Sequence, residues 1–396
     1  MKLRQEHADF QVEELTDVTP AAEGPFSFYR LEKDGWTTPD ALAAIRRRWK
    51  LEARRVSYGG LKDRHAQTVQ YITILHGPRR NLTHHGVELQ YLGLVREPFT
   101  SKDIKANRFR LTLRSLTEED VARAQAALEE VRREGIPNYF DDQRFGSVSG
   151  NQQFVARYMV LGQYEEALQL ALGAAYEFDR AAQKQEKAIL KEHWGDWSTC
   201  KSLLPRGHAR SLVDYLVSHP TDFRGAVERL RPDLQGLYLS AYQSHLWNRM
   251  LAQWIRQHCR PEQVFVVQLR LGEFPMVRGL DEAQQAQLAS LYLPLPSARL
   301  KIEESDPRAT IIDAVLAEEG FKLGDLKLRG LRKPFFSKGE RAALCLPKDL
   351  AFSASADEHN AKRQKVVLAF ELPRGSYATL VVKRIMQTTN AMDQKA

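Results

Sequence analysis

The chain has 396 residues, of which 43% are hydrophobic and 27% charged, a composition typical of a folded protein and unlike a disordered one. Lysine and arginine number 58 against 50 acidic residues, a net charge of +8 that favours a polyanionic partner without requiring one. The three widely spaced cysteines form no zinc or disulfide pattern, and no apolar run reaches the ~20 residues of a membrane span. We therefore expect a cytoplasmic protein with no metal and no membrane association.

Strand and helix patterns are predicted near the amino terminus. Residues 10–15 alternate apolar and polar side chains, as in a half-buried strand. A helix is predicted over 38–49, with Thr38 as its cap, Pro39 in its first turn and Asp40 at the positive end of its dipole. The basic residues of this segment lie around its outer sides: Arg46, Arg47, Arg48 and Lys50. Such a charge run is commonly a solvated face, and contact with RNA phosphates is the alternative.

An unusual acidic residue follows in the segment GGLKDRHAQTVQYITI. Two glycines predict a bend and residues 71–74 predict a strand, and Asp63 lies between them with Lys62 and Arg64 on either side. Nearby cations favour the ionised carboxylate, and a turn at the end of a sheet is a common place for functional groups. The competing interpretation is a turn aspartate in a surface ion pair.

A strand over 109–116 and an amphipathic helix over 118–134 precede the segment NYFDDQRFG, residues 138–146. Its three aromatics interleave with Asn138, Gln143 and Arg144. Aromatic rings beside amide and guanidinium donors are the chemistry of unpaired RNA recognition. Aromatics that fill the core at a turn are the alternative.

Helical patterns dominate residues 154–347, including a stripe at positions 239, 242, 246, 250 and 254. Strand patterns return at 366–372 and 378–385, where a turn and a strand would deliver Lys383 or Arg384. Strands at both ends and helices between them predict an α+β fold. We expect one domain from residues 1–153 and 348–396, interrupted by a largely helical insertion at 154–347.

Together these segments resemble the TruD family of tRNA pseudouridine synthases nearly end to end. The matching segments are ADFQVEE, GGLKDRHAQTVQ, IPNYFDDQRFG, LSAYQSHLWNRML, LPLP and LPRGSYATLVVKR. The resemblance implies a catalytic domain with a mixed or antiparallel sheet, interrupted by an inserted TRUD domain. It also implies an isomerase that converts uridine, at position 13 in the D-arm, to pseudouridine. Its partner would be tRNA, with no cofactor and no obligate protein partner.

The resemblance also assigns roles to individual residues. Asp63 occupies the catalytic position of the motif G-x-K-D-R-x-A-x-T-x-Q, with Lys62 and Arg64 as its basic neighbours. Phe140 matches the aromatic that stacks on the target base, and Asn138 a residue that helps hold the active site. RNA contacts are expected from basic residues, namely Arg46, Arg47, Arg48, Lys50 and Arg144.

One position near the carboxyl terminus departs from the family pattern. Lys383 stands where the family usually has arginine, and Arg384 where glutamate is common. Lysine can neutralise a carboxylate but lacks the bidentate fork of arginine, so either residue is a candidate partner of Asp63. The other functions considered are the same reaction at another RNA site and a non-catalytic tRNA-binding or folding factor. The intact Asp63 and its setting favour the enzyme.

Overall fold

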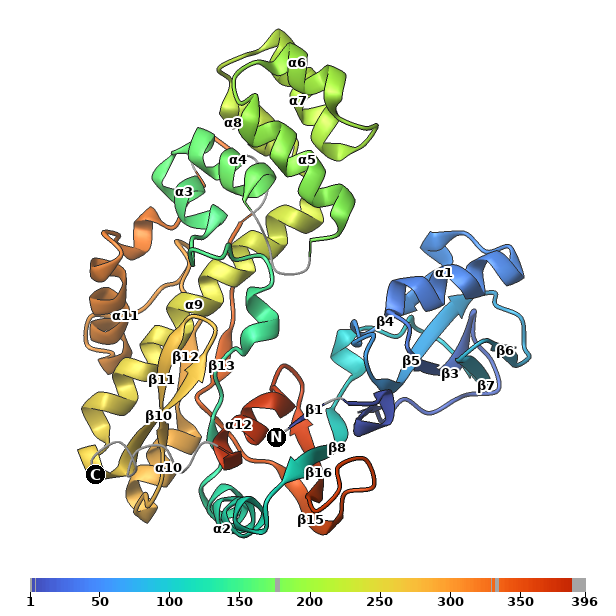
Figure 1. Cartoon of the computed structure of the whole chain (residues 1–396), viewed down its shortest axis with the longest axis vertical. Helices are drawn as coiled ribbons and strands as arrows, with labels where there is room; N and C mark the ends of the chain where they lie inside the picture. The colour runs from blue at the N-terminus through green and yellow to red at the C-terminus, as the bar shows by residue number, and fades with distance from the viewer. Residues whose placement is uncertain (1, 4, 175–178, 329, 332–334, 387–396) are drawn as a thin grey trace. The chain divides into compact units, whose positions relative to one another are not determined.

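The computed structural model describes residues 2–3, 5–174, 179–328, 330–331 and 335–386 (Figure 1). The chain divides into two compact units, which are described separately below. Unit 1 comprises Met1–Ile136 and Cys345–Ala396, and unit 2 comprises Pro137–Leu344. Across the described ranges, no helix combines the length and apolar character that crossing a membrane requires.

The regular elements of unit 1 come from both ends of the chain. They are β1 (Lys2–Leu3), β2 (Phe10–Leu15), β3 (Phe26–Asp34), α1 (Thr38–Trp49), β4 (Val56–Tyr58), β5 (Gln67–Leu75), β6 (Leu82–His84), β7 (Val87–Val95), β8 (Ala106–Leu116), α2 (Glu118–Glu134), β9 (Ile136–Pro137, which ends in unit 2), β14 (Leu344–Cys345, which begins in unit 2), β15 (Lys348–Ala356), β16 (Gln364–Pro373) and α12 (Ala378–Met386), with short 3-10 turns at His7–Asp9, Ala53–Arg55 and Ser101–Asp103.

A mixed sheet forms the centre of unit 1, which confirms the predicted α+β class. Its strand order is β15-β16-β8-β2-β5-β3-β7-β6, with β1 beside β8 and β4 beside β5. The β2–β5 pair is parallel, and β16 from the carboxyl-terminal part lies antiparallel to β8, with Phe109 opposite Phe370. Strands from the two ends of the sequence therefore share one sheet.

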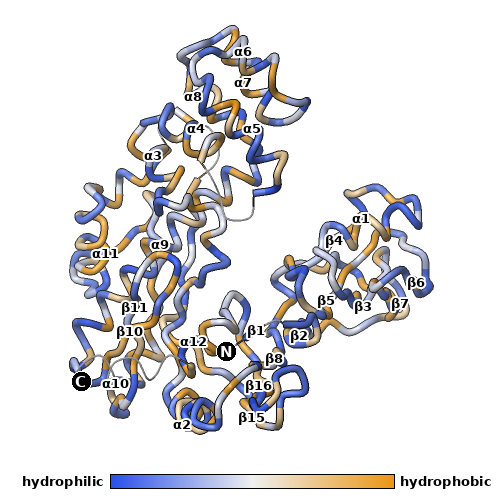
Figure 2. Tube along the Cα trace, viewed as in Figure 1, coloured by the Kyte–Doolittle hydropathy of each residue, from blue (hydrophilic) through white to orange (hydrophobic). Residues whose placement is uncertain are grey.

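Helix α1 covers the part of the sheet that contains β3, β5 and β7. Leu42 and Ile45 of α1 join Tyr29, Leu31 and Ile72 in one buried cluster. Figure 2 shows the interleaving of hydrophobic and hydrophilic residues along α1 that this one-sided packing requires.

The amino-terminal cap of α1 differs from the prediction. Thr37, not Thr38, caps the helix, because the Thr37 hydroxyl accepts a hydrogen bond from the Asp40 N–H at 3.2 Å. Thr38 is buried and its hydroxyl donates instead to Oε1 of Gln70 at 2.8 Å. Thr38 therefore binds a residue distant in the sequence, and the cap lies one residue earlier than predicted.

The predicted carboxyl-terminal strand at 378–385 is wrong, because this segment is the helix α12. Ala378, Val381, Val382 and Ile385 are buried at the i, i+3, i+4, i+7 spacing of a helix, and α12 packs on α2. The β-branched valines favour a strand locally, but packing against α2 overrides that preference.

Unit 2 is mostly helical. Its elements are α3 (Val155–Leu161), α4 (Tyr164–Gly173), α5 (Ala181–Glu192), α6 (Trp197–Leu203), α7 (His208–Ser218), α8 (Phe223–Glu228), α9 (Pro232–His258), β10 (Val264–Leu269), β11 (Gly272–Val277), α10 (Glu282–Ser290), β12 (Tyr292–Pro294), α11 (Pro307–Glu318) and β13 (Glu340–Ala342), with 3-10 turns at Asp142–Phe145, Pro261–Gln263 and Leu323–Asp325.

The long helix α9 packs against α3, α11, β11 and β12. The stripe predicted on this helix is buried as expected, at Leu239, Tyr242, Leu246, Met250 and Trp254. The units divide at 136/137 and 344/345, whereas the sequence placed the boundaries at 153/154 and 347/348. Residues that follow Ile136 pack inside unit 2, where the Tyr139 hydroxyl donates to the Pro275 carbonyl at 2.8 Å.

Candidate functional site

Asp63 lies on the loop of residues 59–66, between β4 and β5. Three polar side chains bind the main chain of this loop. Lys33 Nζ donates to the Asp63 carbonyl oxygen at 2.7 Å, and Gln70 Nε2 donates to the Gly60 carbonyl at 3.2 Å. The Thr38 hydroxyl accepts from the Lys62 N–H at 2.9 Å. We call Lys33, Thr38 and Gln70 the Asp63 cradle. All three side chains belong to buried residues.

The glycine that begins the loop has a steric role. A Cβ on Gly59 would lie 2.5 Å from Cδ1 of Ile104, so a side chain there would require Ile104 to shift. Gly59 is therefore closely packed, whereas a Cβ on Gly60 would meet nothing within 4 Å.

Thr38 and Gln70 connect the cradle into one network. The Thr38 hydroxyl donates to Gln70 Oε1 while it accepts from the loop, and the Gln70 amide reaches Gly60. Buried polar groups rigidify a structure when their hydrogen bonds are satisfied in this way. Gln70 is the last residue of the motif that contains Asp63, and the sequence alone assigned it no role.

Sequence reasoning missed Lys33. Its residue is only 2% exposed, and Nζ donates to the Trp36 carbonyl at 2.6 Å as well as to Asp63. Burial lowers the pKa of Lys33 to about 8, while the negative charge of Asp63 acts in the opposite direction. The alternation of side chains along β3 could have identified it, since Lys33 follows Tyr29 and Leu31 at every second position and all three residues are buried.

The two basic neighbours of Asp63 contact other groups. Lys62 Nζ lies 2.8 Å from Oε1 of the fully buried Glu14 and donates to Asn107 Oδ1 at 2.9 Å. Arg64 Nε donates to the Gly35 carbonyl at 3.2 Å. Their electrostatic support of Asp63 stays a prediction, and Lys62 clearly neutralises Glu14.

Two of the predicted RNA-binding residues line one hollow of unit 1. Its volume is about 790 Å³, and its lining consists of Gly35, Trp36, Asp40, Ala43, Arg46, Arg47, Leu51 and Arg64. The structure thus brings Arg46 and Arg47 of α1 together with Arg64, which follows Asp63 in the chain. We call this feature the arginine hollow. Arg48 and Lys50 are exposed and lie outside its lining.

A second group of candidate residues lies in unit 2, around Asn138 and Phe140. Asn248 binds the Phe140 main chain twice, accepting from its N–H and donating to its carbonyl, each at 2.8 Å. Arg341 donates to the Asn138 carbonyl at 2.8 Å and to Asn138 Oδ1 at 2.7 Å. Arg144 donates to the Ser244 hydroxyl at 3.0 Å. Asn248 and Arg341 hold this segment, and the sequence had not assigned them that role.

The ring of Phe140 is closely surrounded. The Arg341 guanidinium lies 4.2 Å from its centroid, and Trp247 meets it edge-on at 5.5 Å. The residue is 8% exposed. Its stacking on a target base stays a prediction.

Lys383 and Arg384 lie on α12. Arg384 is buried and its guanidinium forms an ion pair with Glu130 of α2 at 2.7 Å, so it stabilises the packing of these two helices. Lys383 is partly buried, and its role beside Asp63 stays a prediction.

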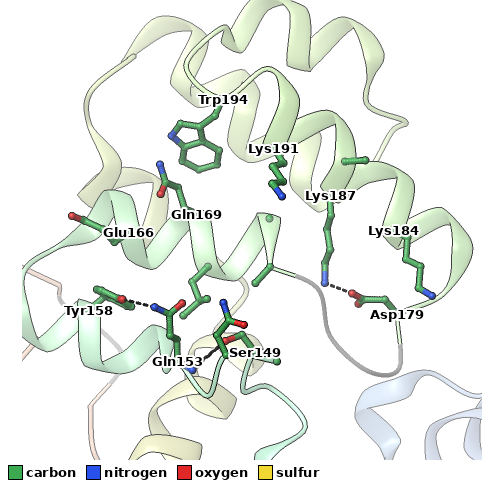
Figure 3. A pocket seen from close by; sticks show the side chains of 16 residues that line it. Ser149, Gln153, Tyr158, Glu166, Gln169, Asp179, Lys184, Lys187, Lys191 and Trp194 are labelled. Atoms are coloured by element: carbon green, nitrogen blue, oxygen red, sulfur yellow. Dashed lines mark hydrogen bonds and ion pairs between the residues drawn. The ribbon is translucent and has the colours of Figure 1, made fainter.

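A further hollow, in unit 2, presents lysines that the sequence had not singled out (Figure 3). Its volume is about 800 Å³, and Lys184, Lys187 and Lys191 of α5 line it together with Trp194. Lys187 pairs with Asp179 at 2.6 Å, whereas Lys184 and Lys191 are exposed. We call it the lysine hollow.

Comparison with known proteins identifies the family. Residues 1–385 match the family model described as tRNA pseudouridine synthase D (TruD). A Methanococcus maripaludis protein named "Probable tRNA pseudouridine synthase D 1" is 30% identical, covering 97% of this chain and 99% of its own length. The tRNA pseudouridine synthase D of Geobacter metallireducens is 32% identical, covering 96% and 93%.

A solved structure agrees with these relatives. The crystal structure of a Methanosarcina mazei protein designated TruD is similar with a TM-score of 0.72 and 27% identity, covering 97% of this chain and 93% of the other. Sequence and fold therefore agree over almost the whole length. The chain belongs to the TruD family of tRNA pseudouridine synthases.

Proposed function

We propose that this protein isomerises uridine to pseudouridine at position 13 of tRNA, in the D-arm, with Asp63 as the catalytic carboxylate. The observation that carries this proposal is the Asp63 cradle, which binds the main chain at Asp63 itself and at Gly60 and Lys62 before it. A reactive group must be held in a defined geometry, and buried hydrogen bonds to a loop supply that.

The reaction breaks the C1′–N1 bond, turns the base and joins C5 to C1′, while the proton on C5 is replaced by one on N1. Atoms and electrons balance within the nucleotide, so the stoichiometry requires no cofactor. A carboxylate can attack the sugar or the base, or abstract a sugar proton. Each route starts from ionised Asp63.

The target uridine must leave its stack, which costs a few kcal/mol and least where it is unpaired. Stacking on an aromatic ring such as Phe140 returns ~1–3 kcal/mol in known systems. In this proposal Asn138 helps hold the active site through its bonds to Arg341, and Lys383 adds positive charge near Asp63.

Phosphate binding is assigned to the arginine hollow, with Arg48, Lys50 and Arg144 as further contacts. The composition of the hollow supports this assignment, because the side chains of Arg46, Arg47 and Arg64 line it together. The lysine hollow is a second candidate surface for the RNA backbone. Such contacts make binding sensitive to salt.

The test is pseudouridine mapping, by carbodiimide labelling and primer extension, on unmodified tRNA with uridine at position 13. Wild-type protein should create a stop at position 13, and Asp63→Asn should create none while it binds tRNA with unchanged affinity. A stop elsewhere would retain the reaction and overturn the position. Tight binding without pseudouridine in any tRNA would favour a non-catalytic tRNA-binding factor.

A further inference from the structure

We infer that Lys33 is a positioning residue for Asp63, and that the positive charge it carries inside the fold is required for isomerisation. The inference rests on the proposed role of Asp63. The cation that acts on Asp63 thus comes from β3, and not only from the residues beside Asp63 in the chain.

The backbone of Lys33 lies within the sheet. Lys33 pairs with Thr68 of β5 on one side and with Val87 of β7 on the other. Its side chain follows Tyr29 and Leu31 on the buried face of β3. This position has little freedom to shift, so the ammonium group has a fixed origin.

The ammonium group binds two carbonyl oxygens from different loops. One belongs to Trp36, just before α1, and the other to Asp63 itself, at 2.6 and 2.7 Å. Lys33 therefore joins the start of α1 to the Asp63 loop. The bond to the main chain of Asp63 fixes the point from which its carboxylate extends.

A charge at this position needs an explanation, because burying an ammonium group costs free energy that a methionine would avoid. The charged groups that act on Lys33 are Asp63 and Lys62 of the loop and Asp34 at the end of β3. Two carboxylates and two carbonyl dipoles outweigh the single like charge of Lys62. The arrangement keeps a positive charge beside the negative charge of Asp63.

The state of Lys33 should appear in the pH dependence of the reaction. Burial lowers the pKa of Lys33 to about 8, so its charge is present at neutral pH and is lost as the pH rises through that value. A lysine with an ordinary pKa of about 10.4 would give no such change near pH 8. The single-turnover rate should therefore decline above pH 8.

The test compares wild type, Lys33→Met and Lys33→Arg in single-turnover assays with tRNA between pH 6 and 10. Methionine keeps the length of the side chain and removes the charge, whereas arginine keeps a charge throughout this range. Lys33→Met should react about 100-fold more slowly at pH 7, with no decline above pH 8, and bind tRNA with unchanged affinity. Lys33→Arg should react faster than Lys33→Met and also lack the alkaline decline.

Controls separate this inference from the proposed function and from a folding defect. Lys105→Met removes an exposed lysine that pairs with Asp17, and should leave the profile unchanged. A Lys33→Met protein that reacts within threefold of wild type, or an alkaline decline that persists in Lys33→Arg, would overturn the inference. If Lys33→Met does not fold, the Lys33→Arg profile decides. Activity in Asp63→Asn would overturn the proposed function instead.

Discussion

Replacing Lys62 by methionine should destabilise unit 1 through Glu14. The Lys62 and Glu14 side chains are 12% and 0% exposed, and Nζ lies 2.8 Å from Oε1. Breaking a buried ion pair by removing one partner typically costs about 3–5 kcal/mol, because the other charge stays buried. The second oxygen of Glu14 still accepts from the Tyr71 N–H at 3.1 Å, so we expect about 3 kcal/mol, the lower end of that range.

The assay is urea denaturation combined with hydrogen exchange of peptides from β2 and β5, which reports unit 1 separately. Lys62→Met/Glu14→Gln should recover about 2 kcal/mol of the loss, since the double variant leaves no buried charge. Lys105→Met is the matched control: its pair with Asp17 is 63% and 68% exposed, and it should cost below about 1 kcal/mol.

Two results would refute this reasoning: a cost below about 1 kcal/mol for Lys62→Met, or a double variant as unstable as the single one. Either would mean that Glu14 does not depend on the Lys62 charge. The function of Lys62 would then be the one predicted from the sequence, as a basic neighbour of Asp63.

Three further predictions concern unit 2. Asn248→Leu removes both hydrogen bonds to the Phe140 main chain and should lower the free energy of unfolding by about 2–6 kcal/mol. Ser240→Ala on the same helix is the control and should have little effect. Equal urea midpoints for Asn248→Leu and the wild type would contradict this prediction. Burial lowers the pKa of His245 to about 4, so the unfolded chain binds a proton before the folded protein does as the pH falls below 6.5. The free energy of unfolding should therefore decrease by about 3 kcal/mol between pH 6.5 and 4. Urea denaturation over this pH range should show that His245→Gln lacks this decrease. Lys184→Glu/Lys191→Glu in the lysine hollow should weaken tRNA binding at least ~10-fold and reduce its salt dependence by about two ions. The control is Lys201→Glu on α6, which pairs with Asp214 outside that hollow and should leave tRNA binding unchanged. An unchanged dissociation constant for the double variant would exclude RNA from the hollow.

Elements with strong local signals could be predicted from the sequence. Helix α2 begins and ends at the expected residues 118 and 134, because Thr117 forms a capping box with Asp120 and Gly135 follows the last turn. The strand at 10–15 follows from simple alternation. The predictions failed where a distant partner decides. Thr38 binds Gln70 instead of capping α1, and α12 is a helix because α2 covers it.

The candidate site divides in the same way. The motif around Asp63 could be recognised because its residues are consecutive. Lys33 and Arg341 could not be assigned, since their partners Asp63 and Asn138 lie 30 and 203 residues away in the chain. Their contacts depend on sheet pairing and on the packing of unit 2. Neither is encoded in a local pattern.

The spacing of the motif has a structural cause. Its second half, A-x-T-x-Q, begins at Ala66 directly before β5 and continues into that strand, where successive side chains point to opposite faces. Ala66, Thr68 and Gln70 therefore lie on the same buried side, while Gln67 and Val69 are partly exposed. A buried strand position normally takes an apolar residue. Gln70 is polar, and its amide donates a hydrogen bond to the Gly60 carbonyl and accepts one from the Thr38 hydroxyl of α1. The strand half of the motif thus holds the loop half, because Gln70→Leu would remove the side-chain hydrogen bonds to Gly60 and Thr38 without removing a backbone bond of the sheet.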